Sequence, residues 1–124
     1  MIAKLLPAIL WTVFVISISL TPGNEFPKLE KEFEHIDKLV HVFLYSGLSF
    51  LWYYDLRRSG IAQMIKLRTD VFLSFVLLGL GVLLETLQHF FVPMRTFDIW
   101  DIVSNGIGIV IGFSTFYFVI YRRI

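Results

Sequence analysis

The chain has 124 residues, of which 56% are hydrophobic and only 17% charged, with a mean hydropathy of +0.73 and a formal net charge of +1. This composition excludes an ordinary soluble domain, and the absence of cysteine excludes disulfides, thiolate metal sites and cysteine nucleophiles. No basic face alternates with aromatic residues, so nucleic-acid binding has no support. The length allows one compact domain, residues 1–124.

Four apolar segments follow one another along the chain, at residues 2–20, 36–54, 71–92 and 99–121. Each has about the 20 apolar residues that a membrane-spanning helix needs. An outer loop (21–35), a linker (55–70) and a short turn connect them. The pattern predicts an all-α membrane protein with four transmembrane helices in a small bundle. An alternative remains for the first segment, because Lys4, the apolar run and the small residues Ser17 and Ser19 also fit a cleavable signal peptide.

The distribution of lysine and arginine predicts how the helices are oriented. Seven basic residues lie at the two ends of the chain and in the linker, against four on the opposite side of the predicted membrane. The seven are Lys4, Arg57, Arg58, Lys66, Arg68, Arg122 and Arg123, and the four are Lys28, Lys31, Lys38 and Arg95. Both termini are therefore expected on the cytoplasmic side of the cell (inner) membrane. Linker 55–70 is then an ordinary cytoplasmic connection.

Polar residues interrupt the last two apolar segments at helical spacing. Asp98, Asp101, Asn105, Gly108 and Gly112 fall at i, i+3, i+7, i+10 and i+14, which is one face of a helix. Ionisable groups inside apolar helices are costly to desolvate and are functional candidates by default. The predicted topology brings this stripe to the outer side of the membrane. The same side receives the start of the second segment and the end of the third, with Asp37, Lys38, His41, Glu85, Gln88 and His89.

Charge and side-chain chemistry suggest roles for these residues. His41, Glu85 and Asp101 are the predicted catalytic groups, suited to acid-base chemistry. The predicted substrate-binding residues are Lys38, Gln88, Arg95, Asp98 and Asn105. Gly108 and Gly112 form a small-xxx-small pair and are predicted to pack helices closely.

Several interpretations of the polar residues remain open. Arg95 is a natural bidentate partner for Glu85, Asp98 or Asp101, and such a pair could serve only to shape the outer turn. Four carboxylates face only Arg95 and Lys38, so a histidine is protonated, a carboxyl is neutral or a cationic ligand binds. We assign no metal ligands, because no strict signature such as HExxH is present. A metal site from His41, Glu85, His89 and an aspartate stays as an alternative.

Two blocks of sequence carry a family resemblance. Asp37-Lys38-Leu39-Val40-His41 looks like a D-K-x-x-H entry into a span, and the polar positions from Glu85 to Gly112 look like a C-terminal signature. Both are similar to the VanZ-like membrane proteins, named for an accessory teicoplanin-resistance protein. The resemblance covers nearly the whole chain and implies four spans. It also implies site assignments for His41, Glu85, Gln88, Arg95, Asp98, Asp101 and Asn105.

The resemblance implies a link to glycopeptide resistance, teicoplanin in particular, but the reaction of the family is not settled. The leading hypothesis is a protein that acts, at the outer leaflet among membrane lipids, on a lipid-linked or amphiphilic cell-envelope molecule, or on an amphiphilic glycopeptide. Whether it is an enzyme stays open, and its cofactors are unknown. The alternatives are a non-enzymatic binding or shielding protein, a small proton-coupled transporter, and a purely structural polar network.

Overall fold

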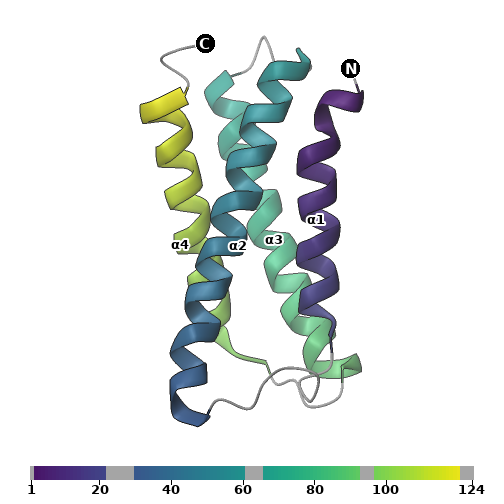
Figure 1. Cartoon of the computed structure of the whole chain (residues 1–124), viewed down its shortest axis with the longest axis vertical. Helices are drawn as coiled ribbons and strands as arrows, with labels where there is room; N and C mark the ends of the chain where they lie inside the picture. The colour runs from purple at the N-terminus through teal and green to yellow at the C-terminus, as the bar shows by residue number, and fades with distance from the viewer. Residues whose placement is uncertain (1, 22–29, 61–65, 93–96, 121–124) are drawn as a thin grey trace.

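The computed structural model describes residues 2–21, 30–60, 66–92 and 97–120, and these residues are helical almost throughout, without a strand. The elements are η1 (Ile2–Leu5), α1 (Leu6–Ser19), α2 (Glu30–Ser59), α3 (Lys66–Phe91), α4 (Ile99–Thr115) and the π-helical η3 (Phe116–Ile120). Successive helices run up and down, so α1 begins at the same end of the bundle at which α2 ends and α3 begins (Figure 1). The prediction of an all-helical fold is confirmed. The predicted outer loop, 21–35, lies mostly outside the described residues.

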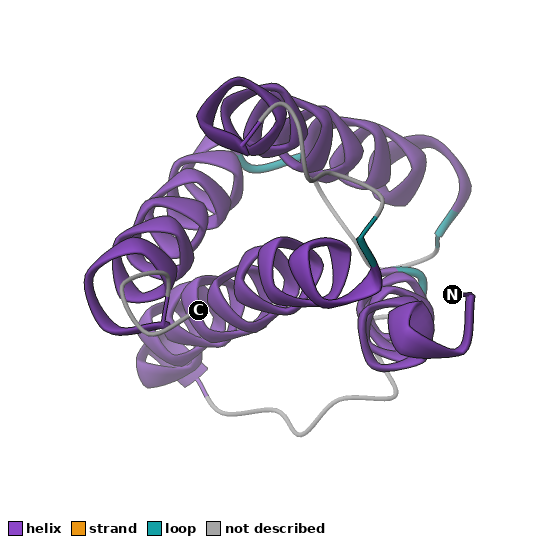
Figure 2. Ribbon diagram, turned by 90° about the horizontal axis from the view of Figure 1, so that it is seen from above, coloured by secondary structure: helices purple, strands orange, loops and turns teal. Residues whose placement is uncertain are grey.

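The four long helices lie side by side around a common axis (Figure 2), with α2 in contact with both α1 and α4, and α3 in contact with α4 and α1. The closest approach is between α2 and α4. A Cβ atom at Gly112 would lie 2.6 Å from the carbonyl oxygen of Ser46, and one at Gly108 would lie 3.0 Å from the amide nitrogen of the same residue. Small residues permit such close backbone approach. The two glycines therefore lie where α4 packs against α2.

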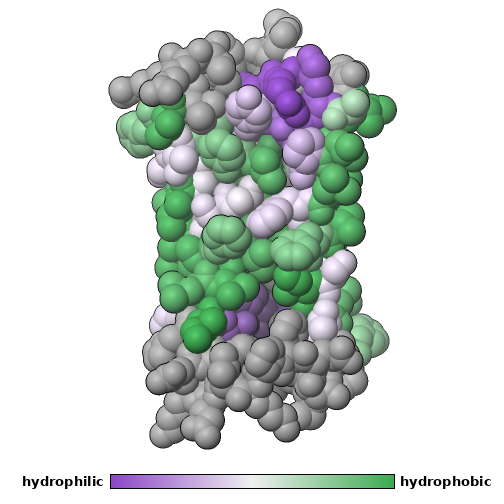
Figure 3. Space-filling view, in the orientation of Figure 1, coloured by the Kyte–Doolittle hydropathy of each residue, from purple (hydrophilic) through white to green (hydrophobic). Residues whose placement is uncertain are grey.

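Apolar side chains fill the centre of the bundle and also cover its outside. The buried core includes Leu44, Tyr45 and Leu48 of α2, with Leu84 of α3 and Ile109 of α4. Figure 3 shows hydrophobic side chains over the sides of the bundle and hydrophilic ones near its ends. Within the described residues, three helices are long and apolar enough to cross a membrane: Ile2–Ser19, Arg68–Phe91 and Ile99–Val119. The chain is therefore a multi-pass membrane protein.

Helix α2 differs from the other three in where its charges lie. Its 30 residues measure about 45 Å at helical rise, which exceeds the roughly 30 Å of a bilayer core. However, its stretch without Asp, Glu, Lys or Arg covers only residues 39–54, because Lys38 and Asp55 bound it. Helix α2 is therefore long enough to cross a bilayer but not apolar enough to count among the candidate spans, and the predicted fourth span, 36–54, is not shown.

Helical structure reaches into the predicted connection, residues 55–70, from both sides. Helix α2 continues to Ser59 and α3 begins at Lys66, and Asp55 and Asp70 are buried with 1% and 0% exposure. The physical reason is that each carboxylate has partners inside the bundle. Asp70 pairs with Arg57 at 2.6 Å, and Asp55 accepts a hydrogen bond of 2.9 Å from the backbone N–H of Ala8 in α1.

Candidate functional site

Five charged or titratable side chains meet where α2 passes the start of α4. They are Asp37, Lys38 and His41 of α2 with Asp98 and Asp101 at the N-terminal end of α4, here called the α2–α4 cluster. The Nζ atom of Lys38 lies 2.6 Å from Asp98 Oδ2 and 2.5 Å from Asp101 Oδ1, and donates to both. The side chain of Asp101 is 8% exposed, whereas that of Asp98 is 38% exposed. One lysine thus bridges two carboxylates of the facing helix.

The orientation of His41 is fixed by the amide of Asn105. His41 Nδ1 lies 2.8 Å from Asn105 Oδ1, and both residues are buried. An amide oxygen only accepts hydrogen bonds, so Nδ1 carries the proton of the neutral ring and Nε2 presents its lone pair. Nε2 lies 3.8 Å from Asp37 Oδ2 and 3.8 Å from an oxygen of Asp101. Three acceptor atoms therefore face one another across a small space.

Asn105 lies between two neighbouring helices. Its Oδ1 contacts His41 of α2, and its Nδ2 lies beside Gly81 of α3, where an added Cβ atom would be only 2.7 Å away. The ring of Tyr45 borders the same glycine at 3.4 Å. The absence of a side chain at Gly81 therefore leaves the room in which Asn105 holds the imidazole.

The start of α4 is held from α3 by Glu85, and the exposed His89 lies one helical turn further along α3. Glu85 Oε1 accepts a hydrogen bond of 3.0 Å from the N–H of Asp98, and His89 Nδ1 accepts one of 3.4 Å from the N–H of Phe97. Glu85 is 1% exposed. Because the bond from Asp98 fixes the backbone at the start of α4, Glu85 positions the α2–α4 cluster. His89 lies outside the cluster and contacts the aromatic rings of Phe90 and Phe97.

Asp98 also caps α4. Its backbone is extended and its Oδ1 accepts a hydrogen bond of 2.9 Å from the N–H of Trp100, as an N-terminal cap does. The ammonium of Lys38, which donates to the other oxygen, holds the pKa of Asp98 below its ordinary value. Both oxygens of Asp98 are thus used by the fold, and this favours the interpretation in which Asp98 shapes the turn.

The structure separates the remaining predicted site residues. Gln88 is buried at 1% exposure and donates its amide hydrogen to the backbone carbonyl of Ser19, so it joins α3 to the end of α1. Arg95 lies outside the described residues, and so does its predicted pairing with a carboxylate. The partner that the structure gives to Asp98 and Asp101 is Lys38.

The α2–α4 cluster carries an excess of negative charge. It contains three carboxylates and one ammonium group, which gives a formal charge of −2 when His41 is neutral. A cation or a hydrogen-bond donor placed among these groups lowers the cost of their charges at the edge of a low-dielectric bundle. The acceptor atoms of Asp37, His41 and Asp101 therefore suit a cationic or hydrogen-bond-donating group.

Sequence reasoning missed a second buried network at the opposite end of the bundle. Asp70 accepts hydrogen bonds from Arg57 and from the hydroxyl of Tyr117, and the hydroxyl of Tyr53 lies in hydrogen-bond contact with Ser74 one turn further along α3. The guanidinium of Arg57 also lies over the ring of Phe116, 5.9 Å from its centroid. The available signal was an aspartate at the start of an apolar helix together with a nearby arginine.

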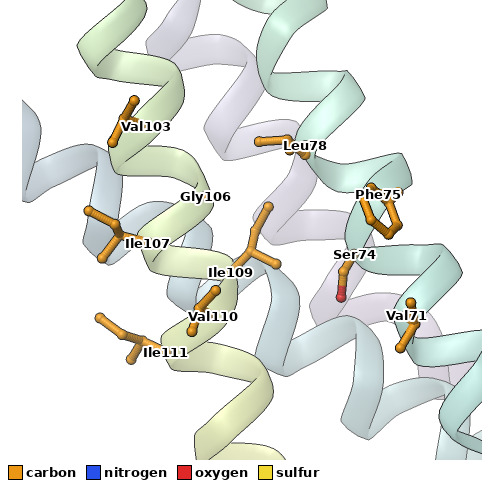
Figure 4. Close-up of a pocket in the computed structure, with 10 residues that line it drawn as sticks. All are labelled: Val71, Ser74, Phe75, Leu78, Val103, Gly106, Ile107, Ile109, Val110 and Ile111. Carbon is orange, nitrogen blue, oxygen red and sulfur yellow. The ribbon is translucent and has the colours of Figure 1, made fainter.

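An apolar groove of about 560 Å³ lies between α3 and α4. Figure 4 shows its lining side chains, which come from these two helices. They include Phe75 and Leu78 of α3 with Val103, Ile107 and Val110 of α4. The groove begins at Val103, two residues beyond Asp101, and reaches Ile111, which is about 12 Å further along the helix axis. A polar cluster and an apolar groove thus adjoin the same helix.

Comparison with known proteins gives one match. The family model described as VanZ/LLP1 matches residues 5–121, which is nearly the whole chain. No curated protein and no solved structure matches. The matched region contains every residue of the α2–α4 cluster and both helices that line the groove.

Proposed function

The chain belongs to the VanZ/LLP1 family, and on this premise we propose that it acts at the outer leaflet of the cell membrane on an amphiphilic or lipid-linked envelope molecule. The observation that carries the proposal is the α2–α4 cluster, a set of titratable groups at one end of the helices in which His41 and Asp101 are buried and the other three are partly exposed. Such groups are rare in apolar helices and mark binding or reaction sites. The family further suggests a link to resistance against glycopeptides such as teicoplanin.

The proposed topology has four spans with both termini in the cytoplasm. Lys4, Arg57 and Arg58 gather at one end of the bundle, where Lys4 Nζ donates to the carbonyl of Arg58 and Arg58 donates to the carbonyl of Lys4. Basic residues favour the cytoplasmic side. Helix α2 lies alongside α1 and α4, and it would cross the membrane with its charged ends in the two interfaces.

Single cysteines test this topology, because the chain contains none of its own. Ser59→Cys marks the end with the basic residues, and Phe97→Cys marks the end with the α2–α4 cluster. We expect a membrane-impermeant maleimide to label the Phe97→Cys variant in intact cells and the Ser59→Cys variant only after lysis. Labelling of both variants in intact cells would refute an outer-leaflet site with four spans.

The arrangement of the site supports an amphiphilic ligand. The acceptor atoms of Asp37, His41 and Asp101 would receive a positively polarised part of the head group, since the cluster carries net negative charge. The exposed apolar side chains of the bundle would accommodate a hydrocarbon chain within the surrounding lipid. The groove at Val103 lies on another face of α4, because two residues beyond Asp101 correspond to about 200° of helical rotation. A molecule with both parts matches a lipid-linked envelope compound.

The three predicted catalytic residues differ in what their reactive atoms contact. His41 Nε2 faces the space between two carboxylates, so it is the atom that meets the ligand. Asp101 lines the same space. Glu85 binds the backbone of Asp98, and its contribution is to position α4.

The proposal is tested with the purified full chain in nanodiscs incubated with a bacterial lipid extract. Lipids retained by the protein and lipids newly formed are identified by mass spectrometry. We expect His41→Ala and Asp101→Asn to lose the species that the wild type retains or converts, and His89→Ala to keep it. Equal retention and conversion by all four proteins would contradict a ligand site at the cluster.

One observation favours the non-enzymatic binder as a second candidate. Lys38, Asp98 and Asn105 are each engaged with other protein groups, which is typical of side chains that shape a binding site. The same experiment separates the two candidates, because a binder retains a lipid species without forming a new one. The link to resistance is measured apart from it, as the rise in teicoplanin tolerance when the chain is expressed in a susceptible strain.

A further inference from the structure

We propose that the α2–α4 cluster binds a divalent first-row transition-metal ion, such as Zn²⁺ or Mn²⁺, through Asp37, His41 and Asp101. One ligand atom from each of these residues lies within 4.8 Å of the others. The set differs from the alternative considered from sequence, because Glu85 and His89 face the backbone at the start of α4. The inference concerns the same site as the proposed function but does not depend on it, since metal binding is measured without a substrate.

The first argument is geometric. Nε2 of His41 is 3.8 Å from Asp37 Oδ2 and 3.8 Å from an oxygen of Asp101, which is beyond hydrogen-bond distance. Bonds from Zn²⁺ to imidazole nitrogen or carboxylate oxygen measure about 2.0–2.2 Å, so one ion bridges atoms up to roughly 4 Å apart. Small rotations of the side chains suffice to place all three atoms around a single ion.

The second argument comes from the residue behind the histidine. A metal-binding imidazole usually donates its other N–H to an oxygen, which fixes both the tautomer and the ring orientation. Asn105 Oδ1 lies 2.8 Å from His41 Nδ1 and does this here, leaving the Nε2 lone pair directed between two carboxylates. Asn105 belongs to α4 and is buried between helices, so the orientation is built into the fold.

The third argument is charge. The three proposed ligands include two carboxylates, whose formal charge of −2 equals in size the charge of a divalent ion. Mixed imidazole and carboxylate ligands favour first-row transition metals over Mg²⁺ and Ca²⁺. Three protein ligands also leave at least one coordination position open, as in sites where a metal contacts a second molecule.

Lys38 gives the proposal an unusual consequence. Its ammonium lies 2.5 Å from Asp101 Oδ1 and 3.8 Å from Asp37 Oδ2, so it repels an incoming ion and holds one of the ligands. Removing this charge is expected to strengthen metal binding. A lysine that only stabilises a metal-free site has no such effect.

The test uses the purified full chain in nanodiscs, stripped with a chelator and titrated with ZnCl₂ in a calorimeter. We expect one Zn²⁺ per chain, unaffected by a tenfold excess of Mg²⁺. The affinity for Zn²⁺ should fall at least tenfold in His41→Ala and in Asp37→Asn. Asp37 is partly exposed, so the fold tolerates its replacement by the isosteric asparagine. The affinity should fall about 10–100-fold in Asn105→Ala. It should rise severalfold in Lys38→Met and stay unchanged in His89→Ala.

Each contrary result overturns the assignment. The first is the absence of stoichiometric Zn²⁺ binding by the wild type, and of Mn²⁺ binding when MnCl₂ replaces ZnCl₂ in the same titration. The second is equal binding by wild type, His41→Ala and Asp37→Asn. The third is a loss confined to His89→Ala, which would place the ion on that exposed histidine. Gel filtration of each variant in nanodiscs, together with its helical circular dichroism, separates loss of the metal from loss of the fold.

Discussion

Gly112 gives the sharpest test of how α2 and α4 position the site. In Gly112→Ala the new Cβ atom would lie 2.6 Å from the carbonyl oxygen of Ser46 and 3.1 Å from the amide nitrogen of Phe50. Both are backbone atoms and cannot rotate away. Since ordinary contacts of a Cβ atom begin near 3.4 Å, the helices must separate by about 0.8 Å. Overpacking of this kind costs about 1–3 kcal/mol.

The same separation reaches the α2–α4 cluster. If α4 moves as a rigid body, the bond of 2.8 Å between His41 and Asn105 lengthens by up to the same amount, which passes the limit of about 3.5 Å for a hydrogen bond. We therefore expect Gly112→Ala to lose stability and also to weaken binding at the cluster. The alanine side chain favours the helix by roughly 1 kcal/mol relative to glycine, which offsets part of the loss.

Gly106→Ala is the matched control on the same helix. Its Cβ atom would meet only the flexible end of Leu78, at 3.9 Å. This variant should be as stable as the wild type or slightly more stable, through helix propensity alone. Unfolding of both variants in detergent is followed by tryptophan fluorescence against temperature. If Gly112→Ala unfolds with or after Gly106→Ala, the close contact between α2 and α4 does not exist as described.

Three further predictions concern stability. Arg57→Leu should lower the free energy of unfolding by about 3–5 kcal/mol, because it removes the cation that pairs with the buried Asp70. Combining Arg57→Leu with Asp70→Leu should recover much of this loss. Equal unfolding temperatures for the single and the double variant would show that the pair is not desolvated. Asp98→Ala should lower stability by about 0.5–2 kcal/mol at neutral pH by removing the cap of α4. The pKa of Asp98 is held below its ordinary value in the folded protein. The extra stability of the wild type is therefore present above the unfolded pKa of about 3.9 and is lost as the pH falls through the folded pKa. The unfolding curves of wild type and Asp98→Ala should converge in acid and stay apart at pH 7. Gln88→Ala should cost about 1–3 kcal/mol, since a buried carbonyl of α1 loses its donor; an unchanged midpoint in thermal unfolding would mean that α1 is held to α3 by apolar packing alone.

The sequence by itself determined the helices and the face on which the polar residues of α4 lie. Helical periodicity is a local property, so Asp101, Asn105, Gly108 and Gly112 could be assigned to one stripe from spacing alone, and all four are buried against neighbouring helices. The alternation of apolar segments and short connections likewise predicted that the starts of α2 and α4 lie at the same end of the bundle, as Figure 1 shows.

Only the tertiary structure decided which polar groups bond to one another. Whether Lys38 or another cation meets Asp98 and Asp101 depends on the rotation of α2 about its axis and on its distance from α4, and the spacing of residues within one helix carries neither quantity. The same holds for Asp55 and Asp70, which stand at the ends of the predicted linker and for which the sequence indicated no partners. Their burial follows from partners that lie 47 residues away in the chain, the backbone N–H of Ala8 and the hydroxyl of Tyr117, which come near only when the helices pack.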